Sequence, residues 1–585
     1  MSGIAGIALA SGRLPDLGVL DRMTRALAHR GPDGRGHHVS GPVALSHTRL
    51  AVIDPAGGDQ PLFAGPAALI ANGGILNDLE LREANALACS TGSDCEPPLH
   101  LWRRDGLRFA DHLRGMYAIA IHDRAARRVV LARDPFGIRP LYLAQVEGGV
   151  AFASEPSAIL ATGLVRPRIR AEARDELLQL RFTTGAETIF EGIRRLLPGE
   201  TLVLGSGAVL ERARREALPE GGPEPITEEA ALDRFGAAFR ESVALHQRSD
   251  LPLGLLLSGG TESAAVLATM ARLSTRPVLA YTAGFDVPGA SDERERAARA
   301  ARASGARHER VGVTEAEVWR HLPEIVACMD DPAADYGIVT TWFLARRARE
   351  EVTVLLSGEG GDELLAGYGR HRAAMRPWWL GGKAMRAHGA FDRLDVLREA
   401  PRAWRDGVAA VEAAALTGGR TRLQAAQALD IADSLPNDLL AKLDRCLMAH
   451  GVEGRTPFLD EAVARACWRL PDSMKVRNGR GKWLLRQWLA REFPACEPFA
   501  RKQGSAVPLG AWIASAADRL APLVAAQPGV AEIARPDRIL PLFRAAGGKR
   551  EGFAAWNLLF WALWHGRHVE GRRMEGDVFE ALSAR

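Results

Sequence analysis

The stretch Leu255-Leu256-Leu257-Ser258-Gly259-Gly260-Thr261-Glu262-Ser263 decides how this chain folds. An apolar run typical of a buried strand ends at Ser258, and a helix-compatible segment follows directly after two glycines. Free backbone N–H groups and the partial positive charge of a helix N-terminus attract anions at such a turn. Glycines also let the backbone approach a ligand closely, although an ordinary strand–helix turn can carry two glycines as well. The stretch predicts a cradle for the phosphates of a nucleotide.

The segments around this stretch alternate between strand and helix patterns. They are helix 229–246, strand 253–257, helix 262–273, strand 277–283, helix 292–303 and strand 309–313. Such alternation predicts a parallel sheet with crossover helices, which is a doubly wound α/β domain. Ligands of these domains bind at the carboxyl ends of the strands.

A second glycine cluster has the same form. The apolar run 354–356 ends in Ser357-Gly358, and three carboxylates, Glu359, Asp362 and Glu363, follow among further glycines. Mg²⁺ bridges phosphates through one or two carboxylates. The two clusters together predict a Mg²⁺–nucleotide site.

Composition excludes several classes of protein. The 585 residues are enough for two or three domains, and 47% apolar with 25% charged residues is typical of a globular protein. A net charge of +4 without a dense basic run argues against a nucleic-acid partner. Neither a signal peptide nor an apolar run of about 18 residues is evident, so no membrane span is expected. The six cysteines form no C-x-x-C pair, which favours free thiols and the cytoplasm. They are Cys89, Cys95, Cys328, Cys446, Cys467 and Cys496.

The first two hundred residues contain many short strand patterns and few helices. Ranges 43–53, 116–121 and 129–132 are strand-like, and 17–28 is the clearest helix. This mixture predicts a sandwich of sheets covered by helices. Gly, Pro and charge then dominate 205–228, which predicts a connection. The expected domains are therefore residues 1–204 and 229–585, joined by 205–228.

A set of motifs in the first domain occurs in a characteristic order. They are 1–7, 29–34, 49–54, Asn72-Gly73-Gly74, 93–96 and 133–142. Together they resemble the glutaminase domain of class II glutamine amidotransferases, in the form found in asparagine synthetases. The resemblance implies an N-terminal-nucleophile αββα sandwich, with two antiparallel sheets between helix layers.

The resemblance also assigns a glutamine pocket. Arg49 would hold the substrate α-carboxylate, Asn72 and the Gly73 N–H would form the oxyanion hole, and Asp94 would bind the α-ammonium group. Gly74 stands where the family has a glutamate that shares this last task. The complete glutamine-binding set is Arg49, Leu50, Ala51, Val52, Ile53, Asn72, Gly73, Gly74 and Asp94.

The nucleophile departs from the family pattern. A cysteine, exposed when the initiator Met is removed, attacks glutamine in the family, whereas this chain has Ser2. A thiol, with a pKa of about 8.5, is far more acidic than a hydroxyl, so glutaminase activity is expected to be weak or absent. Three interpretations stay open: an active N-terminal serine, a domain retained for packing, or a serine put in place of a natural cysteine.

The second domain resembles the ATP-pyrophosphatase domain of asparagine synthetases. Supporting motifs are 448–460, 481–486 and 501–503. The resemblance implies that ATP adenylates a carboxylate and that an amine then attacks, which releases AMP and pyrophosphate. It places ATP at Leu256, Ser258, Gly259, Gly260, Ser263, Ala283, Ser357 and Gly358. It places Mg²⁺ at Glu262 and Asp362, the acyl-adenylate at Glu359, and a phosphate-stabilising charge at Lys482. It also implies a homodimer.

The leading hypothesis is an amide-forming ligase of the asparagine synthetase type that acts on aspartate, with nitrogen from glutamine or ammonia. Ser2 and Gly74 favour an alternative, a ligase on another carboxylate and amine, similar to β-lactam synthetase or lasso-peptide cyclases. A non-catalytic regulatory homologue is a third possibility, against which the two retained glycine clusters argue. In all cases the expected ligands are small molecules.

Overall fold

The computed structural model describes residues 2–285, 287, 293–377, 379, 382–416, 418–500 and 507–584. The motif at 501–503 and the first residue of the helix predicted over 292–303 lie outside these ranges.

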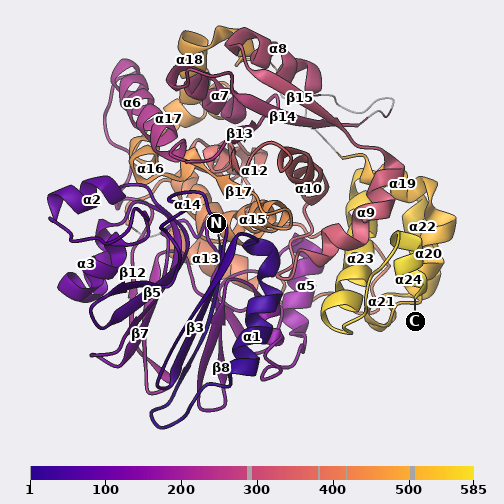
Figure 1. The fold of residues 1–585 in the computed structure, drawn as a ribbon. Helices are drawn as coiled ribbons and strands as arrows, with labels where there is room; N and C mark the ends of the chain where they lie inside the picture. Colours follow the sequence, from indigo (N-terminus) through magenta and orange to yellow (C-terminus); the bar gives the residue numbers. More distant parts are fainter. Residues whose placement is uncertain are drawn as a thin grey trace.

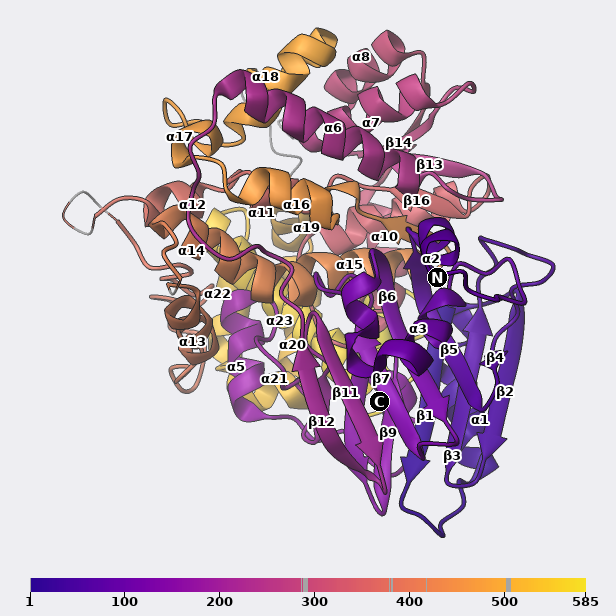
Figure 2. The same cartoon turned by 90° about the vertical axis from the view of Figure 1, so that its left-hand side faces the viewer.

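The first domain consists of two six-stranded sheets packed face to face (Figures 1 and 2). Their strand orders are β10-β8-β9-β1-β3-β2 and β12-β11-β7-β6-β5-β4, and the pairs within them are antiparallel. Fully buried apolar residues such as Ile4, Leu45, Ile70 and Leu131 fill the space between the sheets. The strands are β1 Ser2–Leu9, β2 Gly34–Ser40, β3 Val43–Arg49, β4 Leu62–Ala64, β5 Ala67–Ile75, β6 Gly115–Asp123, β7 Arg128–Arg133, β8 Tyr142–Val146, β9 Gly149–Ala153, β10 Ile193–Arg195, β11 Glu200–Gly205 and β12 Ala208–Arg214.

Helices cover the outer faces of both sheets. The Asp16 carboxylate accepts the Gly18 N–H at the start of α1 (Leu17–Ala26), which packs on β1 and β3. On the other side, α3 (Pro97–Asp105) packs on β4 and β5. The remaining helices of this part are α2 Asp78–Ala84, α4 Pro156–Leu160 and α5 Ala171–Leu180. The predicted αββα sandwich is confirmed.

The range predicted as a connection, 205–228, contains a strand that the sequence pattern did not indicate. Residues 208–214 form β12, which pairs with β11 at the edge of the second sheet. Side chains of β12 are exposed along nearly its whole length, so they lack the apolar alternation that marks a strand in a sequence. The domain limits 1–204 and 229–585 stay a prediction.

The second domain contains a five-stranded parallel sheet with the order β15-β14-β13-β16-β17. Its strands are β13 Leu253–Leu256, β14 Leu279–Gly284, β15 Arg307–Gly312, β16 Val354–Leu356 and β17 Glu453–Arg455. The chain winds in one direction from β13 to β15 and returns on the other side of β13 with β16. The predicted doubly wound fold is confirmed, and its ligand-binding switch point lies between β13 and β16.

Helices lie on both faces of this sheet. α7 (Thr261–Leu273) and α8 (Arg294–Ser304) pack on one side, and α10 (Gly337–Ala348) and α15 (Leu440–Met448) pack on the other (Figure 1). The other helices before residue 500 are α6 Glu228–His246, α9 Glu315–Ala327, α11 Gly361–Leu364, α12 Gly369–Ala374, α13 Asp406–Ala415, α14 Arg422–Leu429, α16 Glu461–Trp468, α17 Asp472–Lys475 and α18 Trp483–Glu492. A π-helical segment, Asp430–Leu439, leads into α15.

The C-terminal part is a helical layer around α23 (Lys549–His568). Buried Trp556, Trp561 and Trp564 of α23 donate their indole N–H groups to backbone carbonyls of Ala334, Gly529 and Met329. Its tryptophans therefore belong to the core. The other helices are α19 Leu509–Ser515, α20 Ala517–Ala525, α21 Pro528–Ile533, α22 Pro536–Arg544 and α24 Val578–Ser583.

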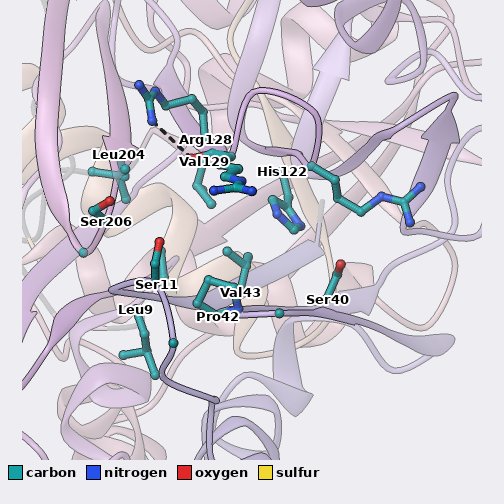
Figure 3. Close-up of a pocket in the computed structure, with 17 residues that line it drawn as sticks. Leu9, Ser11, Ser40, Pro42, Val43, His122, Arg128, Val129, Leu204 and Ser206 are labelled. Carbon is teal, nitrogen blue, oxygen red and sulfur yellow. Dashed lines mark hydrogen bonds between the residues drawn. The ribbon is translucent and has the colours of Figure 1, made fainter.

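The end of the sandwich away from the second domain is hollow. Four segments that follow β1, β2, β6 and β11 surround a cavity there, which we call the distal cavity (Figure 3). The opposite end of the sandwich, which carries Ser2 at the start of β1, faces the second domain (Figures 1 and 2).

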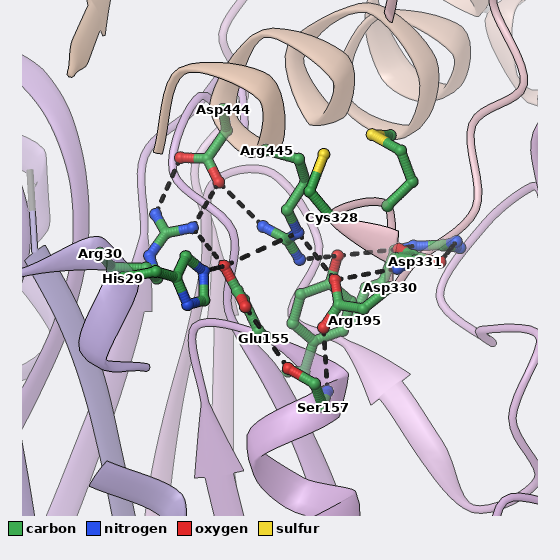
Figure 4. A network of polar contacts seen from close by, with 12 residues as sticks. His29, Arg30, Glu155, Ser157, Arg195, Cys328, Asp330, Asp331, Asp444 and Arg445 are labelled. Carbon is green, nitrogen blue, oxygen red and sulfur yellow. Dashed lines mark hydrogen bonds and ion pairs between the residues drawn. The ribbon is translucent and has the colours of Figure 1, made fainter. Parts of the chain in front are cut away.

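Buried ion pairs join the two domains (Figure 4). Arg30 donates to both carboxylate oxygens of Asp444 on α15, at 2.7 and 2.9 Å. Arg195 of β10 donates to both oxygens of Asp331, at 2.7 Å each. Burial opposes the charge of Asp444, but the guanidinium of Arg30 and that of Arg445 hold the pKa of this carboxyl below its ordinary value. Such pairs fix the relative orientation of the domains, because breaking one leaves a buried charge unmatched.

Asp331→Asn tests this interface. The substitution leaves the Arg195 guanidinium buried without a carboxylate, so we expect the free energy of unfolding to fall by about 3–5 kcal/mol. Chemical denaturation of the full chain measures the change. The matched control is Asp518→Asn, which breaks an exposed pair with Arg544 and is expected to cost less than about 1 kcal/mol. Equal losses in the two variants would contradict the role of the buried pair.

Candidate active sites

The two glycine clusters of the second domain meet at one cavity. Because β13 and β16 are parallel neighbours, their carboxyl ends lie at the same edge of the sheet. The cavity has a volume of about 460 Å³. The predicted residues that line it are Leu256, Ser258, Gly260, Glu262, Ser263, Ala283, Ser357, Gly358, Glu359 and Asp362. Gly259 does not line it, since this residue packs against the backbone of Glu293.

Glycines in the second cluster permit an unusually close approach to α7. A Cβ on Gly358 would lie 2.7 Å from Cβ of Glu262, and one on Gly361 would lie 2.7 Å from its Cγ. Gly360 has a φ of +93°, a conformation that favours glycine. The glycines therefore serve to bring the second cluster onto the first turn of α7.

The first cluster forms a small polar cradle. The Ser258 N–H donates to Oγ of Ser263 at 3.1 Å, and the two hydroxyl oxygens are 3.2 Å apart. α7 begins at Thr261 without a side-chain cap. Its first N–H groups and these hydroxyls provide the donors that an anion needs.

Two carboxylates converge on one cation beside the cavity. The Lys482 ammonium forms an ion pair with Glu262 and lies 3.0 Å from Oδ1 of Asp362. Burial opposes its charge, but these two carboxylates raise the pKa of Lys482 above its ordinary value. Lys482 also has a φ of +57°, which is uncommon for a residue with a Cβ and typical of functional positions. It does not line the cavity itself.

Lys442 on α15 is a cavity residue that the sequence did not reveal. Its Nζ is 3.5 Å from Oε1 of Glu359 and 3.8 Å from Oδ1 of Asp335. The residue is 8% exposed, and these two carboxylates are its ion-pair partners. A lysine within the apolar run 439–443 was the available signal. A buried ammonium has three N–H donors, so Lys442 could also donate to an anionic ligand in the cavity that it lines.

The predicted glutamine pocket is also assembled, around a cavity of only about 40 Å³. The predicted residues lining it are Ser2, Arg49, Leu50, Val52, Ile53, Gly73, Gly74 and Asp94. Ala51 and Asn72 are not among them. The Ala51 N–H donates to Asp33. The strand pattern over 43–53 ends at Arg49, which lets 50–53 leave the sheet and form the wall of the pocket.

Asn72 has the geometry of an oxyanion-hole donor. Its Oδ1 accepts the Ser2 backbone N–H at 3.0 Å, while its buried Nδ2 has no acceptor. The next residue, Gly73, has a φ of +137°, and a Cβ there would lie 1.9 Å from the Met116 carbonyl oxygen. Asn72 is thus oriented by Ser2 and retains a donor that can stabilise an oxyanion.

Two residues assigned to glutamine recognition have other partners. Three of the five N–H groups of Arg49 are used by the carbonyls of Asp54 and Pro55 and by the Asp59 carboxylate. Asp94 accepts the Ile75 N–H at 3.0 Å. Burial of its carboxyl, and to a smaller extent the negative charges of Asp78 and Glu453, raise the pKa of Asp94 to about 6. A Cβ on Gly74 would lie 2.9 Å from Oδ2 of Asp94, so a glutamate at 74 would require Asp94 to move.

The second domain completes this pocket. Glu453 and Arg455 of β17 line it, and Arg455 Nε donates to Oε1 of Glu453 at 2.6 Å. The sequence did not indicate that these two residues lie in the first pocket. The Arg455 carbonyl also accepts the N–H of Ser357, a nucleotide-site residue, at 2.8 Å. A single backbone hydrogen bond therefore links the walls of the two sites.

The fold and the paired sites define a class: an amidotransferase-type domain joined to a nucleotide-dependent synthetase domain. The family model described as asparagine synthase matches residues 234–566, and the glutamine amidotransferase domain model matches residues 1–213. The chain belongs to the asparagine synthase family and is a carbon–nitrogen ligase that uses ATP and small-molecule substrates.

Two relatives illustrate the similarity. A putative glutamine-hydrolyzing asparagine synthetase of Mycobacterium tuberculosis is 32% identical, with 94% of this chain and 93% of that protein covered. Asparagine synthetase 1 of Bacillus subtilis, also glutamine-hydrolyzing, is 28% identical, with 96% of this chain and 95% of that protein covered.

Within the described ranges, every helix is too short or too polar to cross a bilayer.

Gly358→Ala tests the contact between the clusters. The new Cβ would displace α7 from the second cluster, and a shift of about 1 Å in a reacting geometry can cost about a hundredfold in rate. We expect that loss in ATP–pyrophosphate exchange, with little change in thermal stability. Gly312→Ala is the matched control, because a Cβ there meets nothing within 4 Å. An active Gly358→Ala enzyme would show that the close approach is dispensable.

Proposed function

We propose that the chain adenylates the side-chain carboxylate of aspartate with ATP and converts the acyl-adenylate into an amide, with AMP and pyrophosphate as the other products. The observation that carries the proposal is the meeting of two glycine clusters and two converging carboxylates at one cavity. Ammonia or another amine, rather than glutamine, is the proposed main nitrogen source.

ATP is proposed to lie along the carboxyl edge of the sheet. The loop 258–260 and the Ser263 hydroxyl would bind the departing pyrophosphate, since N–H donors and hydroxyls converge there. Leu256 and Ala283 would border the adenosine, and Ser357 and Gly358 would lie at the α-phosphate. All of these positions except Gly259 line the cavity, which supports the proposed placement.

Glu262 and Asp362 would hold Mg²⁺. The test of fit is that both carboxylates already converge on a cation, the Lys482 ammonium. Glutamate at 262 is one methylene longer than the family's aspartate and remains a hard oxygen ligand. Mg²⁺ would neutralise charge on the phosphates, and Lys482 would stabilise the negative charge that develops there as the α-phosphate is attacked.

The acyl substrate is proposed to lie between Glu359 and α10. Lys442 lines this space beside Glu359, and its ammonium could donate a charge-assisted hydrogen bond to a substrate carboxylate. Glu359 borders the same space and can accept the proton that the attacking amine loses. An amino acid with two carboxylates, such as aspartate, can therefore be adenylated at one end and held at the other.

Several features reduce the expected use of glutamine. Ser2 is a poor nucleophile without a strong base, and Arg49 is engaged by backbone carbonyls. The pocket around them is very small. The same features support the alternative, a ligase that acts on another carboxylate and another amine.

We also propose that the chain forms a homodimer.

Carboxylate-dependent exchange of labelled pyrophosphate into ATP tests the proposed adenylation. We expect exchange with aspartate, and formation of asparagine when ammonia is added. Exchange with a different carboxylate alone would favour the alternative ligase. Absence of exchange with every carboxylate would refute both.

Lys442→Met is expected to raise KM for aspartate about tenfold or more, with KM for ATP unchanged, because a charge-assisted hydrogen bond is lost.

Release of glutamate from glutamine tests the first site. We expect a blank-level rate for the unaltered chain and a measurable rate after Ser2→Cys, because a thiolate is accessible near neutral pH. Since the pKa of Asp94 is raised to about 6, its carboxyl is neutral at lower pH and cannot bind the α-ammonium group. The rate should therefore fall about tenfold per pH unit in that range.

The matched control is the double variant Ser2→Cys with Asp94→Asn. It should be slow at all pH values and should lack this acid limb. A Ser2→Cys enzyme with no activity would locate the defect elsewhere in the pocket.

A further inference from the structure

The distal cavity is separate from both candidate sites. Its volume is about 320 Å³, within the range of small-molecule sites. None of the predicted site residues lines it. It surrounds Leu9 at the end of β1, whereas Ser2 begins the same strand, roughly 20 Å away at about 3.3 Å per residue.

The floor of the distal cavity is apolar. Ala8, Val43, Val129 and Leu204 line it and belong to the cluster that fills the space between the two sheets. In Figure 3, Leu9, Val43, Val129 and Leu204 surround the hollow from different strands. The core between the sheets is thus accessible from this end, and an apolar ligand group would extend it.

The rim of the distal cavity is cationic and lacks acids. Arg124 and Arg127 of the β6–β7 turn line it together with Arg128 at the start of β7, and no Asp or Glu is among the lining residues. Arg124 Nε donates to the Pro66 carbonyl at 3.0 Å, and Arg128 donates to the Arg127 carbonyl at 3.4 Å. Within the part of the chain that the structure describes, none of the three has an ion-pair partner. Most of their N–H groups therefore remain available.

The three arginines outnumber the one carboxylate beside them, Asp123, which precedes Arg124 in the chain. Three guanidinium groups within five residues repel one another, and an anion between them would relieve the repulsion. His122 also lines the cavity but adds no charge near pH 7. Burial, and to a smaller extent the positive charges of His38 and Arg124, lower its pKa to about 4. A carboxylate or a phosphate would accept hydrogen bonds from the guanidinium groups.

We propose that the distal cavity binds a small anion with an apolar tail. The head group, a carboxylate or a phosphate, contacts Arg127 and Arg128, and the tail lies against Val43, Val129 and Leu204. Apolar burial holds the tail, and charge-assisted hydrogen bonds hold the head group. The site does not depend on the proposed ligase chemistry.

Calorimetric titration of the full chain tests the proposal with four probes. Octanoate and octyl phosphate carry both groups, 1-octanol lacks the charge, and inorganic phosphate lacks the tail. We expect saturable binding of at least one octyl anion to one site, at least about tenfold tighter than either control probe. The tighter octyl anion identifies the preferred head group. Octyl anions that bind no tighter than 1-octanol, or show no saturation at millimolar concentration, would overturn the proposal.

A pair of double variants locates the site. Arg127→Ala with Arg128→Ala is expected to weaken binding of the octyl anion at least about tenfold. Arg35→Ala with Arg108→Ala removes the same charge from exposed positions elsewhere in the domain and should leave affinity unchanged. Circular dichroism checks that both variants are folded. Unchanged affinity in the first variant, or an equal loss in the second, would contradict this location.

Discussion

The close approach of two glycine-rich turns is the constraint on which the functional part of this structure depends. Gly358 and Gly361 lie so near Glu262 that any side chain would collide with it. The contact forms because β13 and β16 are parallel neighbours whose carboxyl ends coincide. It brings Glu262 and Asp362 to one ammonium group and gives both turns the same cavity. The reversal of strand order thereby supports the proposed nucleotide site.

The second constraint is the shared boundary of the domains. β17 is an edge strand of the parallel sheet, yet Glu453 and Arg455 on it close the pocket of Ser2. Its backbone also holds Ser357 of the nucleotide site. Buried ion pairs such as Arg195–Asp331 fix the relative orientation of the two domains at this boundary. A change in either domain can therefore alter the other site through a few rigid contacts.

Local patterns predicted the long elements well. The helix expected over 262–273 is Thr261–Leu273, and the one expected over 229–246 is Glu228–His246. Both have apolar residues at helical spacing, a property of neighbouring residues alone. β12 was missed because its side chains are exposed and only its backbone pairing defines it. Lys442 was missed because its role arises from distance to Glu359, which is remote in the sequence.

The sequence by itself determined the fold class, the family resemblance, and the two glycine clusters with their carboxylates. These are encoded by residue type and short spacing, which depend on local chemistry. Only the tertiary structure decided that Arg49 is engaged by its own loop, that β17 completes the first pocket, and that three arginines line the distal cavity. These features depend on which distant segments come together, and long-range packing sets that outcome.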